Sequence, residues 1–243
     1  MLTPADQALF DQQGFVAVRG LVPPAEMATV ARELAGIHER MDQAPPPGVG
    51  LAWEDGVTPR RIKQLMHSEL VSPALNRILR SDAMLAVLRA LIGSDVCLFH
   101  SKLLLKAAGQ GTAVPWHQDY AYWKSDDNQP LMVNCQLAID ACDAGNGCIQ
   151  FLPGSQARGL LPHLRAQKTF GVYLDERYYF DRPDAVKVEL QPGDAVFFGA
   201  LVVHGSAANT SNRDRRMNTF AYNVTGNGKR FCREWLCGRP LTG

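Results

Sequence analysis

From Val96 onward the chain consists of short β-rich runs, and this pattern limits its possible folds more than any other feature. Glycine, proline and asparagine residues separate the runs, and Asn146-Gly147 and Gln191-Pro192-Gly193-Asp194 are strong turn signals. The runs lie at 96–106, 114–120, 131–139, 148–152, 186–190, 195–204 and 216–224. Many short strands with turns between them are typical of a β-barrel or a double β-sheet. We therefore predict a mainly β fold for this part of the chain.

The residues before Val96 follow a different pattern, which predicts helices. Thr3 and Pro4 begin the first expected helix as N-cap and first-turn proline, and Gly14 ends it. The other elements expected here are a strand at 15–18 and helices at 23–41, 73–79 and 82–92. We predict one domain over residues 1–243, with a helical part at about 1–93 packed on a β core at about 94–225. The aromatic and charged segment at about 160–184 is expected to be a long loop, and we interpret it as a candidate lid.

The charge balance excludes several classes of partner. The chain has 25 Lys and Arg residues against 24 Asp and Glu residues, so no general attraction to nucleic acid or an anionic membrane is expected. It has no apolar stretch of transmembrane length and no secretory signal pattern at the N-terminus. We therefore predict a soluble, cytoplasmic protein whose partners are small molecules. The sequence carries no pattern that sets an oligomeric state.

The six cysteines lack a C-x-x-C pair, and most lie in apolar or strand-like runs. This distribution favours reduced, buried thiols in a cytosolic protein over disulfides. A zinc site is the weaker alternative, because Cys142/Cys148 and Cys232/Cys237 do not have the usual ligand spacing.

His117 and Asp119 form a His-x-Asp pair, and His204 lies in a later strand-like run. Side chains alternate along an extended segment, so His117 and Asp119 are expected on one face, with His204 opposite them. Two imidazoles and one carboxylate on one face of an octahedral ion leave positions open, as in non-haem Fe(II) oxygenases. The alternative is that each histidine is an ordinary hydrogen-bonded residue, because one His-x-Asp match by chance is not rare in a chain with six histidines.

Three blocks decide between these interpretations: residues 116–123, residues 146–155 and residues 191–206. In this order they resemble the signature blocks of the phytanoyl-CoA dioxygenase-like family of Fe(II)/2-oxoglutarate oxygenases, and the resemblance covers roughly residues 5–225. It implies a double-stranded β-helix (jelly-roll) core with helices packed outside. It also implies that His117, Asp119 and His204 bind Fe(II), with 2-oxoglutarate and O₂ as co-substrates.

By position in the family pattern, Arg215 is expected to bind the distal carboxylate of 2-oxoglutarate, and Ser206 to add a hydroxyl. Guanidinium is permanently charged and binds a carboxylate through two parallel hydrogen bonds. Arg213 and Arg216 are alternatives. Spacing on an extended strand places Arg213 on the same face as Arg215 and leaves it open as a candidate.

Further candidates are assigned less directly. Gln136 replaces a tryptophan that many family members carry, and it is expected to hydrogen-bond 2-oxoglutarate. Alternation places Lys102 on the face of its strand that points into the barrel, near the co-substrate, although a solvated face is the alternative. Substrate contacts are expected from Trp116, Tyr120, Tyr122, Trp123, Asn134 and Asn223, some of which are instead expected to pack in the core. The basic cluster Arg60-Arg61-Ile62-Lys63 is interpreted as a solvated face rather than as a site for an anionic substrate.

The predicted activity is oxidation, by default hydroxylation, of a C–H bond in a small molecule. A bacterial natural-product or secondary-metabolite intermediate is favoured as substrate over an acyl-CoA, and amino-acid-like solutes and phosphonates remain alternatives. Two other classes stay open: a cupin-like metal enzyme that does not use 2-oxoglutarate, and a binding protein that has kept the fold without the chemistry.

Overall fold

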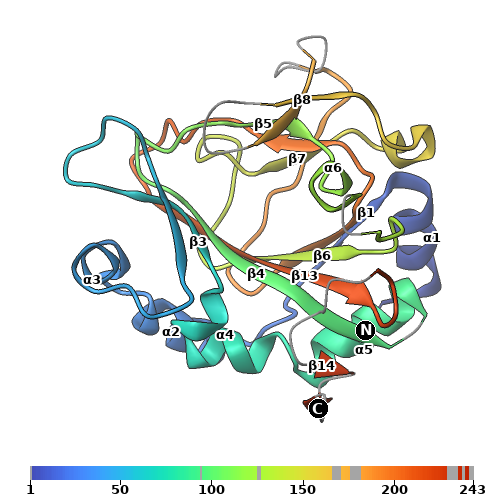
Figure 1. Cartoon of the computed structure of the whole chain (residues 1–243), viewed down its shortest axis with the longest axis horizontal. Helices are drawn as coiled ribbons and strands as arrows, with labels where there is room; N and C mark the ends of the chain where they lie inside the picture. Colours follow the sequence, from blue (N-terminus) through green and yellow to red (C-terminus); the bar gives the residue numbers. More distant parts are fainter. Residues whose placement is uncertain are drawn as a thin grey trace.

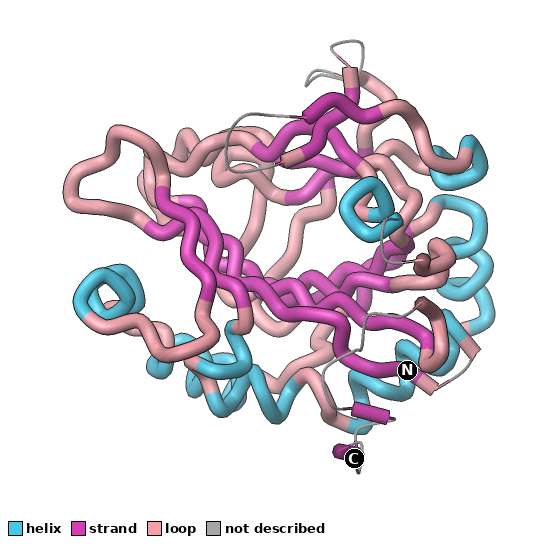
Figure 2. Tube along the Cα trace, viewed as in Figure 1, coloured by secondary structure: helices cyan, strands magenta, loops and turns pink. Residues whose placement is uncertain are grey.

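Two antiparallel sheets face each other in the computed structural model, which describes residues 2–93, 95–124, 127–165, 171–175 and 182–228 and two short strands near the C-terminus. In order, the large sheet contains β1 (Phe15–Val18), β11 (Ala195–Gly199), β6 (Val133–Ala138), β13 (Arg215–Val224), β4 (Val96–Lys106), β3 (Ile62–Met66) and β2 (Gly50–Trp53). The small sheet contains β10 (Val186–Lys187), β7 (Ile149–Phe151), β12 (His204–Ser206) and β5 (Val114–His117). This arrangement confirms the predicted jelly-roll fold (Figures 1 and 2).

Helices cover the face of the large sheet that points away from the small sheet (Figure 1). They are α2 (Pro24–Glu33), α3 (Ile37–Gln43), α4 (Pro73–Ile78) and α5 (Asp82–Ile92). α1 (Pro4–Gln13) lies beside the edge strand β1, and the short α6 (Tyr120–Trp123) lies beside the small sheet. Leu103 and Leu105 of β4 are buried in the core on the helical side. Lys102, Leu104 and Lys106 point to the opposite side, into the space between the sheets. The predicted alternation along β4 is therefore confirmed.

Strong capping signals place the predicted helices correctly. Thr3 forms a capping box with Asp6, and Gly14 ends α1 in the left-handed conformation. Ser81 caps α5 and Gly93 ends it, as predicted. The single helix expected at 23–41 is instead two helices, because Gly36 adopts a φ of 62° between α2 and α3.

Three other predictions for the chain need correction. The N-terminal part contributes β2 and β3, which the sequence pattern did not indicate and which extend the large sheet beyond β4. Part of the expected loop at 160–184 is paired as β8 (His163–Arg165) and β9 (Val172–Leu174). The rest of that candidate lid, at 166–170 and 176–181, lies outside the described residues.

The third correction concerns the cysteines. Cys97 is disulfide-bonded, so the prediction of six reduced thiols is wrong. Cys135, Cys142 and Cys148 are free and buried, and burial raises the pKa of each thiol. Among the described residues, no helix is long and apolar enough to cross a membrane.

Candidate active site

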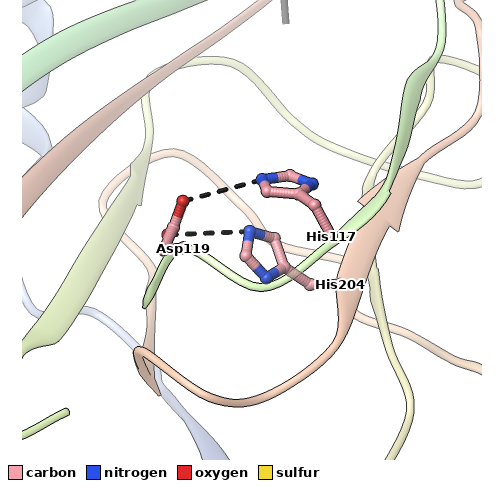
Figure 3. A group of neighbouring side chains, drawn as sticks. All are labelled: His117, Asp119 and His204. Carbon is pink, nitrogen blue, oxygen red and sulfur yellow. Dashed lines mark ion pairs between the residues drawn. The ribbon is translucent and has the colours of Figure 1, made fainter. Parts of the chain in front are cut away.

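Three side chains from neighbouring parts of the small sheet converge on one point. His117 ends β5 and His204 begins β12, and the two residues are direct partners in the antiparallel pairing of these strands. Asp119 lies two residues beyond β5. Figure 3 shows the carboxylate facing both imidazoles, with Asp119 Oδ1 3.6 Å from His117 Nε2 and Asp119 Oδ2 3.7 Å from His204 Nε2. The ligand atoms of the three residues all lie within 4.8 Å of one another.

The local conformation of Asp119 differs from the extended pair that the sequence suggested. Its φ and ψ are −61° and −30°, which are helical values, and it precedes the first residue of α6. The chain therefore turns after His117, and this turn brings the carboxylate back beneath the imidazoles. Strand alternation is not the reason that the two side chains meet.

Gln118 holds this turn in place. Its side chain is buried; Nε2 donates to the carbonyls of Gly159 and Leu201, and Oε1 accepts from the amide of Leu161. Its own backbone amide donates to His163 Nε2 at 3.0 Å. The residue between the two candidate ligands thus connects their turn to two neighbouring loops.

Hydrogen bonds select the nitrogen that each imidazole presents to the centre. His117 Nδ1 lies 2.8 Å from the Pro115 carbonyl, and His204 Nδ1 lies 3.1 Å from the Val202 carbonyl. Since a carbonyl only accepts, each Nδ1 carries the proton and each Nε2 is left with a lone pair. Burial and the neighbouring His117 lower the pKa of His204 to about 3, so the imidazole is neutral at physiological pH. Neutral Nε2 atoms are what a divalent ion requires.

The carboxylate of Asp119 is buried and ionised. Burial opposes ionisation, but the positive charge of Lys102 and the contacts with the two histidines outweigh it and hold the pKa of this carboxyl well below its usual range. Asn134 Nδ2 donates to Asp119 Oδ2 at 2.7 Å, which fixes the orientation of the carboxylate. An ionised oxygen beside two neutral imidazoles has the donor set of a non-haem Fe(II) site. The arrangement fits the ion.

A cavity of about 220 Å³ between the two sheets begins at this centre and extends to Arg215. Arg215 is 3% exposed and has no ion-pair or hydrogen-bond partner among the described residues. Its two rivals are occupied elsewhere, because Arg213 pairs with Asp143 and Arg216 pairs with Asp140. An unpaired buried guanidinium is costly unless a ligand supplies the anion. Arg215 therefore fits the carboxylate of 2-oxoglutarate, and Ser206 lines the same cavity.

Lys106 is a cavity residue to which the sequence assigned no role. It is the strand partner of Arg215, is 3% exposed, and its Nζ donates to the carbonyls of Thr112 and Ala207. Burial, and then the adjacent Arg215, lower its pKa to about 6. The alternation along β4, which places Lys102 and Lys106 on one face, could have identified Lys106 as a cavity residue. The solvated face considered for these lysines is not observed.

The remaining candidates divide into groups. Gln136, Tyr122 and Trp123 line the cavity, with Tyr122 edge-on to His117 at 6.0 Å and with burial raising its pKa to about 12. Asn134 donates a hydrogen bond to the Asp119 carboxylate. Trp116, Tyr120 and Asn223 lie outside the cavity, in apolar packing or in hydrogen bonds to nearby loops.

The residues of the basic cluster at 60–63 lie in two different environments. Arg60 is exposed, pairs with Asp42 and stacks on Trp53, as a solvated face predicts. Lys63 instead lines the cavity beside Glu54, 3.8 Å away.

The family model for phytanoyl-CoA dioxygenase (PhyH) matches residues 10–217 of this chain. The chain belongs to the phytanoyl-CoA dioxygenase family. Family membership and this fold make the protein an oxygenase of the non-haem Fe(II), 2-oxoglutarate-dependent class, and the recognition made from the three sequence blocks is confirmed.

A curated relative and two solved structures show how far the similarity extends. The chain is 28% identical over 169 residues to the L-proline trans-4-hydroxylase of Streptomyces griseoviridis, which is 62% of this chain and 63% of that enzyme. The crystal structure of EctD from S. alaskensis with 2-oxoglutarate and 5-hydroxyectoine has a TM-score of 0.76 at 19% identity, covering all of this chain and 84% of that one. The carbocyclase SnoK from nogalamycin biosynthesis has a TM-score of 0.71 at 19% identity, covering all of this chain and 94% of SnoK.

Proposed function

We propose that the protein hydroxylates a C–H bond of a small molecule, with Fe(II) held by His117, Asp119 and His204 and with 2-oxoglutarate as co-substrate. When bound, the iron and 2-oxoglutarate would supply the electrons that activate O₂ for oxidation of the C–H bond. The chain's own residues orient the reactants. Asn134 keeps the Asp119 carboxylate directed at the ion, and the two backbone carbonyls keep both Nε2 atoms available.

The observation that carries this proposal is the unpaired, buried guanidinium of Arg215 in the same cavity as the three ligands. A 2-oxo acid bound at the ion at one end and paired with Arg215 at the other would satisfy both groups. Ser206 and the Gln136 carbonyl oxygen, which has no partner among the described residues, would complete its hydrogen bonds. A cupin-like enzyme without 2-oxoglutarate would leave Arg215 and Ser206 without a role.

For the substrate, we propose a natural-product or secondary-metabolite intermediate. The small cavity, about 220 Å³ including the space for 2-oxoglutarate, favours a compact molecule over an acyl-CoA. SnoK, whose fold this chain shares, comes from nogalamycin biosynthesis. The relative that hydroxylates L-proline supports an amino-acid-like substrate as the second candidate.

The test is anaerobic addition of Fe(II) and 2-oxoglutarate to metal-free protein. The visible charge-transfer band of chelated 2-oxoglutarate should appear in the wild type and weaken in Arg215→Ala. Iron binding without a band would refute 2-oxoglutarate as the co-substrate. Failure to bind iron would refute the metal assignment and favour a protein that keeps the fold without the chemistry.

A further inference from the structure

Lys102 is a cation in the cavity that the proposed chemistry does not use. It lies in the middle of β4, with Thr219 of β13 and Met66 of β3 as strand partners. Its side chain is half-buried and lines the cavity. Within the described part of the chain, the Lys102 side chain forms no ion pair or hydrogen bond. The ammonium faces the cavity with no carboxylate in ion-pair contact, so an anion bound in the cavity could pair with it.

Position along the strand separates Lys102 from the co-substrate clamp. Four residues of β4, about 13 Å at roughly 3.3 Å per residue, separate Lys102 from Lys106, the partner of Arg215. Lys102 lines the same cavity as Asp119 and His204. Lys106 responds to Arg215, Glu54 and Lys63 at the other end. The two lysines therefore serve different parts of the cavity.

A count of the charges in the cavity shows that Lys102 would have no anionic partner when iron and 2-oxoglutarate are bound. Fe(II) with ionised Asp119 keeps one positive charge, and the carboxylate of 2-oxoglutarate at the metal would neutralise it. The other carboxylate would neutralise Arg215. Lys63 has Glu54 beside it, and the amine of Lys106 is bonded to two carbonyls. After the co-substrate has bound beside Arg215 and Lys106, the positive charge of Lys102 lies farther along β4 without an anion.

We propose that Lys102 binds an anionic group of the primary substrate, a carboxylate or a phosphonate, and so holds the substrate beside the iron. This inference rests on the proposed function, and it reassigns Lys102 from the co-substrate, where the sequence placed it, to the substrate. The occupant is a compact anion, since the cavity has about 220 Å³ for both molecules. Tyr122 and Trp123 would contact its apolar part.

The experiment uses propionate as a probe and propionamide as its neutral isostere. Each is titrated anaerobically into the protein loaded with Fe(II) and 2-oxoglutarate, while the charge-transfer band is followed. Propionate should shift the band of the wild type at concentrations about tenfold or more below propionamide, as expected for a charge-assisted hydrogen bond. Lys102→Gln should weaken propionate binding by a similar factor, and Lys102→Arg should restore it. The control Lys187→Gln removes an exposed lysine on β10 and should change nothing.

Each alternative result is distinguishable. Equal responses to the two probes, or normal propionate binding by Lys102→Gln, would overturn the inference while leaving the proposed function intact. Loss of the band itself in Lys102→Gln, to the extent seen in Arg215→Ala, would return Lys102 to the co-substrate site. Displacement of 2-oxoglutarate by propionate in the wild type would also overturn it. No band in the wild type would overturn the proposed function and this inference together.

Discussion

Replacing Arg215 by methionine should stabilise the protein without ligands and weaken its binding of 2-oxoglutarate. The guanidinium is 3% exposed, lies beside Lys106 and has no anionic partner among the described residues. Burying an unpaired ion costs several kcal/mol, so a methionine of similar length should raise the free energy of unfolding by about 1–4 kcal/mol. For a chain of this size, each kcal/mol corresponds to about 2–4 °C in Tm.

The same substitution removes one partner of the charge pair formed with 2-oxoglutarate. Truncation of a buried pair costs about 3–5 kcal/mol, so the Kd for 2-oxoglutarate should rise roughly a hundred- to several-thousand-fold. Calorimetry would give the unfolding temperature of the metal-free protein, and anaerobic titration with Fe(II) present would give the Kd. Arg213→Met is the matched control, because Arg213 is exposed and paired with Asp143. It should change stability by no more than about 0.5 kcal/mol and leave the Kd unchanged.

If Arg215→Met has a lower Tm than the wild type in the absence of ligands, the unpaired guanidinium of Arg215 does not destabilise the ligand-free protein. Unchanged binding of 2-oxoglutarate would contradict its role as the clamp.

Four other predictions follow from the site and the core. Asp119→Gly should abolish iron-dependent turnover, checked by metal analysis and succinate formation; normal turnover would exclude Asp119 as a ligand. Asn134→Ala should weaken Fe(II) binding by about 10- to 100-fold by releasing the Asp119 carboxylate, and an unchanged metal Kd would mean that this hydrogen bond is dispensable. Free Lys106 has a pKa of about 6, which a bound carboxylate would raise, so 2-oxoglutarate should bind more tightly as pH falls from about 8 towards 6. Calorimetric titration should show this dependence in the wild type and its absence in Lys106→Met. Asn218 is fully buried and its amide has no partner within the described residues, so Asn218→Leu should stabilise the protein by about 1–2 kcal/mol, and denaturant unfolding that shows a loss would point to a missed partner.

Elements with strong local signals were predictable from the sequence. The caps at Thr3 and Ser81 and the glycines that end α1 and α5 act within a few residues, so their effect can be inferred without the fold. β2 and β3 could not be found in this way, because β3 is a strand through pairing with β4, and β2 through pairing with β3, and not through their own pattern. The break at Gly36 was hidden by apolar residues that continue at helical spacing on both sides.

The candidate site also combines features that a local sequence pattern predicts with features that depend on the fold. The motif identified His117, Asp119 and His204, but the reason that Asp119 faces the histidines is a helical turn that strand alternation does not describe. Spacing alone left Arg213 as a rival of Arg215. The structure separates the two arginines, because Arg213 meets Asp143, a residue 70 positions away in the sequence. Contacts at such separations depend on the fold and are not visible in a local pattern.

The two ends of the cavity belong to different sheets. All three candidate ligands come from the small sheet and the turn beside it, whereas Arg215, Lys106 and Lys102 belong to the large sheet. A diacid bound at both ends would link the two sheets. When oxidation shortens that diacid by one carbon, the product can no longer contact both ends of the cavity in the same way. Release of the shortened acid would then remove this link between the two sheets.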